Sequence, residues 1–204
     1  MPGFLITLEG IDNSGKTTQA QKLSNYLSER GYKVLLVRDP GGTKISEKIR
    51  KILLDKKNRL AVSSELFLYL AARYQLVSET ILPAWEKNKI VICDRYCDST
   101  LAYQGYGRGL KVQLVDQILK SFFPIPDLTI LIDIPVQISQ RRFGSNEPDR
   151  LEKEKLSFHQ KVRKGYLEIA KKNRSRVKVV SGAGDVEETW GKIREILDNF
   201  LSRN

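Results

Sequence analysis

Residues 10–17 read Gly10-Ile11-Asp12-Asn13-Ser14-Gly15-Lys16-Thr17, a glycine followed by four residues and then Gly-Lys-Thr. An apolar run at 4–8 precedes this stretch, and residues 16–30 follow it with a helical pattern. Strand, glycine-rich turn and helix in this order form the phosphate-loop motif. The glycines let backbone N–H groups point at phosphate oxygens, and the helix presents its positive dipole end to the same anion. The pattern predicts a site for a nucleoside triphosphate.

Two side chains of the motif carry its chemistry. Lys16 would place a positive charge beside the β- and γ-phosphates, and the hydroxyl of Thr17 would bind Mg²⁺. A glycine-rich loop is sometimes only a turn, but the flanking strand and helix favour a phosphate site. The expected ATP-binding residues are Gly10, Ile11, Asp12, Asn13, Ser14, Gly15, Lys16, Thr17 and Thr18.

The composition is that of an ordinary globular protein. A chain of 204 residues suits a single domain over 1–204, with room for a mobile insertion. Cys93 and Cys97, with one histidine in the whole chain, are poor material for a zinc site, so we expect reduced thiols in a cytoplasmic protein. Neither a signal peptide nor an apolar run long enough for a membrane span is recognisable, so no membrane partner is expected.

The formal net charge of +11 has two interpretations. It is typical of nucleic-acid binding, and it also suits a site that collects two polyanionic substrates. The lysines are scattered through helical segments and do not alternate with aromatic residues as on a single-strand platform. We therefore favour the substrate interpretation and expect no nucleic-acid partner.

Strands alternate with helices along the chain, which predicts an α/β fold with an open parallel sheet and helices on both faces. Ligands of such sheets bind at the carboxyl ends of the strands. A long helix is expected from a cap at Ser63 or Ser64, with a kink or break at Pro83, and a loop where Gly105, Gly107 and Gly109 occur. The expected strands lie at 4–8, 33–37, 90–93, 128–132 and 177–180, and a charged helix at 152–172.

The class of phosphoryl chemistry follows from what surrounds the loop. A GTPase would show Asn-Lys-x-Asp, whereas Asn88-Lys89 is followed by Ile90-Val91. Motor ATPases are usually larger. Arginines next to the strand ends instead suggest a small-molecule kinase, which must hold two anionic substrates in line and neutralise the transferred group.

One family resembles this chain closely: thymidylate kinase (dTMP kinase), a nucleoside-monophosphate kinase. The resemblance implies the three-layer phosphate-loop kinase fold with strand order 2-3-1-4-5, and transfer of the γ-phosphoryl group of ATP to dTMP. It also implies a homodimer. Another nucleotide or deoxynucleoside kinase on the same fold stays an alternative, as does a nucleotide-dependent nucleic-acid-binding protein. The resemblance rests on residues 4–18, 38–50, 71–73, 94–96, 101–105 and 126–128.

The resemblance also assigns acceptor-site roles. Arg50 and Arg95 would clamp the monophosphate of dTMP, and Asp12 would accept a hydrogen bond from the 3′-hydroxyl. Tyr69 stands where the family usually has phenylalanine stacked on thymine, and Arg73 would bond the base. Further base-pocket residues are Thr100, Tyr103 and Gln104.

Three aspartates concern the metal. Asp94 resembles the carboxylate that holds magnesium through water, and Asp133 is a rival that we expect to be structural. Asp39 stands where close relatives carry glutamate, and its shorter side chain puts its role near the metal and acceptor phosphate in question.

The phosphate loop itself carries no arginine, so the chain resembles the subtype that supplies cations from a lid over ATP. The lid would span about 141–155, with Arg142 and Arg150 acting on closure and Arg141 a weaker candidate. The adenine would lie near 181–184, at Ala183. His159 is expected on a helix surface.

Overall fold

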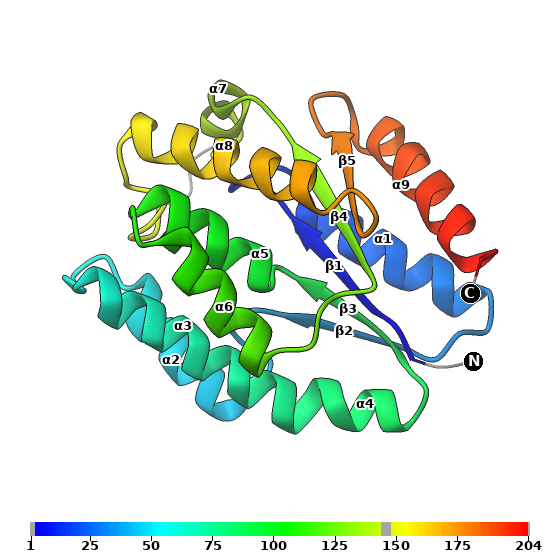
Figure 1. Cartoon of the computed structure of the whole chain (residues 1–204). Helices are drawn as coiled ribbons and strands as arrows, with labels where there is room; N and C mark the ends of the chain where they lie inside the picture. The colour runs from blue at the N-terminus through cyan, green and yellow to red at the C-terminus, as the bar shows by residue number, and fades with distance from the viewer. Residues whose placement is uncertain (1–2, 144–147, 204) are drawn as a thin grey trace.

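The computed structural model describes residues 3–143 and 148–203. Its centre is a sheet of five parallel strands in the order β2-β3-β1-β4-β5, with helices on both faces (Figure 1). The strands are β1 Leu5–Glu9, β2 Val34–Arg38, β3 Ile90–Asp94, β4 Leu128–Asp133 and β5 Val177–Ser181. The predicted three-layer fold and its strand order are confirmed.

Helices cover the sheet because side chains of its strands point alternately to opposite faces. Leu5 joins the core cluster under α3, α6 and α8, whereas Ile6 and Leu8 join the cluster under α1 and α9. The longer helices are α1 Lys16–Glu29, α2 Lys44–Leu54, α3 Val62–Leu76, α6 Val112–Phe122, α8 Leu156–Lys172 and α9 Val186–Leu201. The shorter ones are η1 Val77–Ile81, α4 Leu82–Glu86, α5 Cys97–Thr100, η2 Leu101–Gly107 and α7 Val136–Arg141, of which η1 and η2 are π-helical.

The predicted glycine loop is wrong in part, because Gly105 and Gly107 belong to η2 and only Gly109 adopts a positive φ, of 80°. Gly107 serves close packing: a Cβ there would lie 2.7 Å from Phe158 and 2.8 Å from Val162 of α8. Gly165 of α8 does the same for Tyr106, with a would-be contact of 2.7 Å. Glycine therefore lets η2 and α8 approach each other.

Two helix starts also differ from prediction. Neither Ser63 nor Ser64 caps α3, which begins at Val62 after Ala61 without a side-chain cap. The helical path continues through η1 into α4, which contains Pro83 and ends at Glu86, so the helix changes type next to Pro83 and does not break there. The charged helix α8 begins at Leu156 rather than at residue 152.

All five strands end at one edge of the sheet, and the loops that follow them form the site. The phosphate loop follows β1, Asp39 follows β2, Arg95 follows β3 and residues 182–184 follow β5.

Candidate active site

The phosphate loop is held in shape by residues with positive φ. Gly10 has φ of 145°, and a Cβ on it would lie 2.4 Å from the carbonyl oxygen of Ile132 in β4. Gly15 has φ of 96° and precedes α1, and even Asn13 has φ of 57°. These angles turn the chain tightly from β1 into α1. The N-terminus of α1 therefore opens directly onto the loop.

Lys16 lies inside this loop. Its Nζ donates to the carbonyl oxygen of Ile11 at 2.7 Å and to Ser14 Oγ at 3.4 Å. Burial, and next the positive charge of Arg95, lower the pKa of Lys16 to about 8. A bound polyanion would favour the charged form, so this lysine suits an anion site.

Thr17 and Asp94 bring a hydroxyl and a carboxylate together beside the loop. Thr17 Oγ1 donates to Asp94 Oδ2 at 2.6 Å. The pairing of β1 with β3 places Asp94 opposite Leu8, just before the phosphate loop. Residues 77 positions apart in sequence thus meet where the motif predicted a cation.

A cavity of about 1120 Å³ continues from the phosphate loop toward α2, α3 and η2. It is lined by Asn13, Lys16, Thr17, Thr18 and Asp94. It is also lined by every predicted acceptor-side residue, namely Asp12, Asp39, Arg50, Tyr69, Arg73, Arg95, Thr100, Tyr103 and Gln104. The structure therefore places the phosphate loop and the predicted dTMP-binding residues around the same cavity.

Asp12 lies between Arg95 and Tyr103. Arg95 Nη2 forms an ion pair with Asp12 Oδ1, and the Tyr103 hydroxyl donates to Asp12 Oδ2 at 2.8 Å. Burial alone would raise the pKa of Asp12, but the charges of Arg95 and Lys16 outweigh it, so that the pKa is lowered. Asp12 is thus an ionised acceptor at the wall of the cavity.

Arg73 is fully buried at the far end of α3. Its Nε donates to Asp39 Oδ2 at 2.6 Å, and its Nη2 donates to Thr100 Oγ1 at 2.7 Å and to the Tyr96 carbonyl oxygen at 3.1 Å. Burial raises the pKa of Asp39 despite Arg73. Asp39 Oδ1 is buried without a hydrogen-bond partner among the described residues. Asp39 itself lines the cavity.

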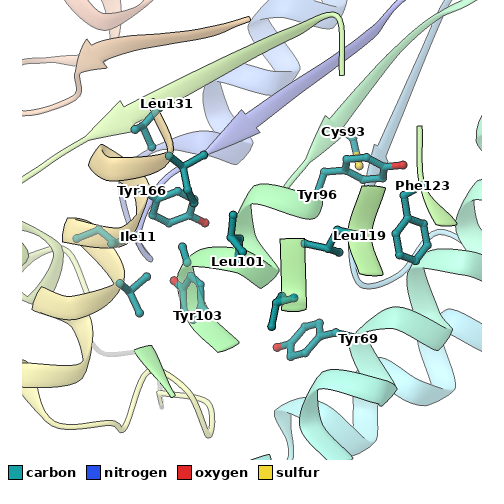
Figure 2. Close-up of a cluster of buried hydrophobic side chains, with 14 of the residues drawn as sticks. Ile11, Tyr69, Cys93, Tyr96, Leu101, Tyr103, Leu119, Phe123, Leu131 and Tyr166 are labelled. Carbon is teal, nitrogen blue, oxygen red and sulfur yellow. The ribbon is translucent and has the colours of Figure 1, made fainter. Parts of the chain in front are cut away.

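The remaining acceptor-side residues approach from three elements. Arg50 of α2 donates to the Pro40 carbonyl oxygen at 2.8 Å, and Gln104 of η2 donates to Glu65 at 2.8 Å. Figure 2 shows Tyr69 of α3 and Tyr103 of η2 within one cluster of buried side chains. Burial raises the pKa of Tyr69, so its hydroxyl stays protonated.

The two predicted lid arginines lie in different places. Arg142 Nη2 donates to the carbonyl oxygens of Gly182 at 2.9 Å and Gly184 at 3.4 Å, beside the exposed Ala183. Its Nη1 donates to the Asn13 carbonyl oxygen at 3.4 Å, so Arg142 bridges the phosphate loop and the loop after β5.

Arg150 instead contacts α2 and α3. Its Nε donates to the Leu53 carbonyl oxygen at 2.7 Å, and its Nη1 pairs with Glu65 at 2.6 Å. Residues 144–147 of the predicted lid lie outside the described residues.

Comparison with known proteins identifies the family. The thymidylate kinase family model matches residues 8–193. Thymidylate kinases of Thermoanaerobacter sp. (strain X514) and Carboxydothermus hydrogenoformans are 45% and 46% identical, over 98% of this chain and 100% and 99% of theirs. This chain belongs to the thymidylate kinase family. The crystal structure of thymidylate kinase from Ehrlichia chaffeensis has a TM-score of 0.80 at 37% identity, covering 97% of this chain and 99% of that one.

In this thymidylate kinase fold, two buried polar residues that the sequence analysis did not single out lie close to the site. Glu65 accepts from Gln104, Arg108 and Arg150, and Glu9 accepts from Ser99 and Tyr166. A charge that ends the apolar strand β1 was a visible signal for Glu9, whereas nothing local distinguishes Glu65 from an exposed helix residue.

Two secondary expectations have opposite outcomes. Asp133 is paired with Arg163 through two hydrogen bonds of 2.7 and 2.8 Å, as expected of a structural residue. His159 is buried in α8 against the ring of Phe158, so its predicted surface position is wrong.

Within residues 3–143 and 148–203, none of the helices has both the length and the apolar run that a membrane span needs.

Proposed function

We propose that this member of the thymidylate kinase family transfers the γ-phosphoryl group of ATP to dTMP, giving ADP and dTDP. One observation carries the proposal: a single cavity joins the phosphate loop to an arginine-rich acceptor side. An oxygen of the dTMP phosphate attacks the γ-phosphorus, and the bond from the γ-phosphorus to the β,γ-bridging oxygen breaks. The attacking oxygen is already ionised, so no general base is required.

On the donor side, the loop amides and Lys16 would bind the ATP phosphates. The hydroxyl of Thr17 and the carboxylate of Asp94 fit Mg²⁺, because both are hard oxygen donors and lie 2.6 Å apart. When bound, the ion would neutralise charge on the phosphates. Among the described residues, His, Cys, Asp and Glu side chains nowhere gather in threes as a ready metal site, so the phosphates would supply the other ligands. The adenine would lie along residues 181–184, near Ala183 and Arg142.

On the acceptor side, Arg95 and Arg50 would bind the dTMP phosphate, and Asp12 would bond the 3′-hydroxyl. Tyr69 would stack on thymine. Arg73, with Thr100 and Gln104, would bond the edge of the base, and Tyr103 would exclude a 2′-hydroxyl. The unpartnered Asp39 Oδ1 would receive a bond through water near the acceptor phosphate.

The lid would complete the site. Arg150 is held by Glu65, yet Glu65 also pairs with Arg108 through two bonds of 3.1 and 3.0 Å and accepts from Gln104. The carboxylate thus stays paired if Arg150 leaves. We infer that Arg150 detaches when both nucleotides are bound and, with Arg142, neutralises the transferred phosphoryl group.

The family relationship also suggests a homodimer in the cytoplasm. Exposed apolar side chains lie on α3 and α6, which lie side by side in Figure 1 and meet where the Tyr74 and Phe123 rings are 6.4 Å apart. They include Phe67, Tyr74, Leu114 and Phe122, each more than half exposed. Apolar area of this kind suits burial against a second copy.

An ADP-release assay tests the reaction. Purified protein would receive ATP and Mg²⁺ with dTMP, dUMP, dCMP, dGMP, dAMP or thymidine in turn. We expect dTMP to give a rate well above all others. Preference for another monophosphate would retain the fold and overturn the base pocket. No activity with any acceptor, together with DNA retention that survives saturation by dTMP, would favour the nucleic-acid-binding alternative.

A further inference from the structure

Glu9 is a buried carboxylate with no part in the steps above. It ends β1 and is fully buried. Its Oε1 accepts from the backbone N–H groups of Tyr96 at 2.7 Å and Ser99 at 3.3 Å. Its Oε2 accepts from Ser99 Oγ at 2.6 Å and from the Tyr166 hydroxyl at 3.0 Å. Two of these donors, the Ser99 and Tyr166 hydroxyls, also contact the guanidinium of Arg95, and a third is the N–H of the residue after it.

The backbone of Arg95 is the first thing these bonds restrain. Arg95 has φ of 68°, a left-handed conformation that is unfavourable for a residue with a side chain. Its own N–H donates to the Leu8 carbonyl oxygen at 3.0 Å, and the next N–H, of Tyr96, donates to Glu9. Two consecutive residues of β1 therefore hold the turn that aims Arg95 at the phosphate loop.

The same hydrogen-bond network also restrains the guanidinium of Arg95. Its Nη1 donates to the Gly10 carbonyl oxygen at 2.9 Å and lies 3.3 Å from the Tyr166 hydroxyl and 3.4 Å from Ser99 Oγ. Ser99 Oγ and the Tyr166 hydroxyl also lie 2.7 Å apart and share a hydrogen bond in which either can donate, so Glu9 and the two hydroxyls form one connected network beside the guanidinium. An amide at this position would place an N–H where Glu9 accepts and would change that network.

We propose that Glu9 is a positioning residue for phosphoryl transfer, which holds the backbone and guanidinium of Arg95 in the orientation that receives the dTMP phosphate. The inference rests on the proposed role of Arg95. It concerns Glu9, Ser99 and Tyr166, three residues from β1, α5 and α8. Ser99 lines the cavity, whereas Glu9 and Tyr166 act from behind it.

The fold alone does not favour a carboxylate here. Burial, and next the neighbouring Asp98, raise the pKa of Glu9 to about 7. A neutral group of the same shape would be easier to bury. A buried carboxylate in such a place is more readily explained by function than by stability.

Equilibrium binding of dTMP and of ATP by titration calorimetry tests the proposal, using Glu9→Gln, Arg95→Lys and the double variant. We expect Glu9→Gln to weaken dTMP binding roughly 10- to 100-fold, because the Arg95 guanidinium would no longer be oriented toward the dTMP phosphate. ATP affinity should change less than about 2-fold. Because Glu9 acts through Arg95, the double variant should bind dTMP no more weakly than Arg95→Lys alone.

Asp98→Asn is the matched control. Asp98 is also buried and lies in α5, but it pairs with Arg176 at 2.7 and 2.8 Å. This variant should lower the melting temperature and leave the ratio of the two affinities unchanged. If Glu9→Gln fails to fold, Tyr166→Phe removes a hydroxyl that contacts both Glu9 and Arg95 without lining the cavity, and it should show the same selective loss of dTMP binding.

Three outcomes would overturn the proposal. Unchanged dTMP binding in Glu9→Gln, equal losses for both nucleotides, or losses that multiply in the double variant would each show that Glu9 does not act through Arg95. Wild-type dTMP binding by Arg95→Lys would instead remove the proposed role of Arg95, and this inference with it.

Discussion

The ammonium group of Lys16 lies inside the phosphate loop, where burial lowers its pKa to about 8. Below that pH the free protein already carries the charge that ATP requires. Above it, ATP binding has to take up a proton, because the bound polyanion favours charged lysine. We therefore expect ATP affinity to fall by up to about 10-fold per pH unit as the pH rises above 8.

Calorimetry in buffers of different ionisation enthalpy would count the protons taken up with ATP. Lys16→Arg is the control, because guanidinium stays charged and should show no uptake in this range, even if it binds ATP more weakly. Absence of proton uptake by the wild-type protein one pH unit above 8 would contradict the lowered pKa.

At the scale of an element, the segment that carries Arg150 is attached to α2 and α3 through Leu53 and Glu65. If Arg150 detaches to meet the transferred phosphoryl group, its contact exists mainly in the transition state. Arg150→Ala should then lower kcat roughly 100-fold or more, with little change in the KM for dTMP. Steady-state kinetics with both substrates would measure the two constants.

Arg108→Ala provides the comparison for Arg150, because Arg108, the residue after η2, binds the same Glu65 and pairs with Glu154 of the predicted lid without being part of that lid. It should lower the melting temperature, since it leaves a buried carboxylate less well paired, and it should leave kcat closer to wild type. A kcat in Arg150→Ala equal to that of the wild type would remove Arg150 from the lid role.

For the molecule as a whole, the exposed aromatic residues of α3 and α6 predict the surface of association. Phe67 is 63% exposed and Phe122 is 60% exposed. Replacing both by glutamate should convert the expected dimer into a monomer, because burying two unpaired carboxylates opposes association. Light scattering after size-exclusion chromatography would give the mass.

Val179→Glu is the control for that surface. Val179 is 47% exposed and lies on β5, which is an edge strand of the sheet and is not part of the α3 and α6 surface. Its mass should stay that of the wild type. A monomeric wild-type protein, or a double variant that remains dimeric, would show that α3 and α6 are not the interface.

Much of this fold could be predicted because its determinants are local. The phosphate loop follows from glycines placed where positive φ is needed, and the parallel sheet follows from short apolar strands alternating with helices. The acceptor residues were located through resemblance to one family, and the structure gathers them around one cavity. The predictions for Gly107 and His159 were wrong. The position of Gly107 depends on the packing between η2 and α8, and that of His159 on its burial within α8.

The chain sequence alone thus determines that a phosphate loop ends the first strand of a parallel α/β sheet, because backbone geometry and strand alternation act over a few residues. Only the tertiary structure decides how the site is held. Glu65 and Arg150 are 85 positions apart, and Glu9 and Tyr166 are 157 apart. Such pairs meet because the fold buries them together, and a buried carboxylate requires partners that no local pattern specifies.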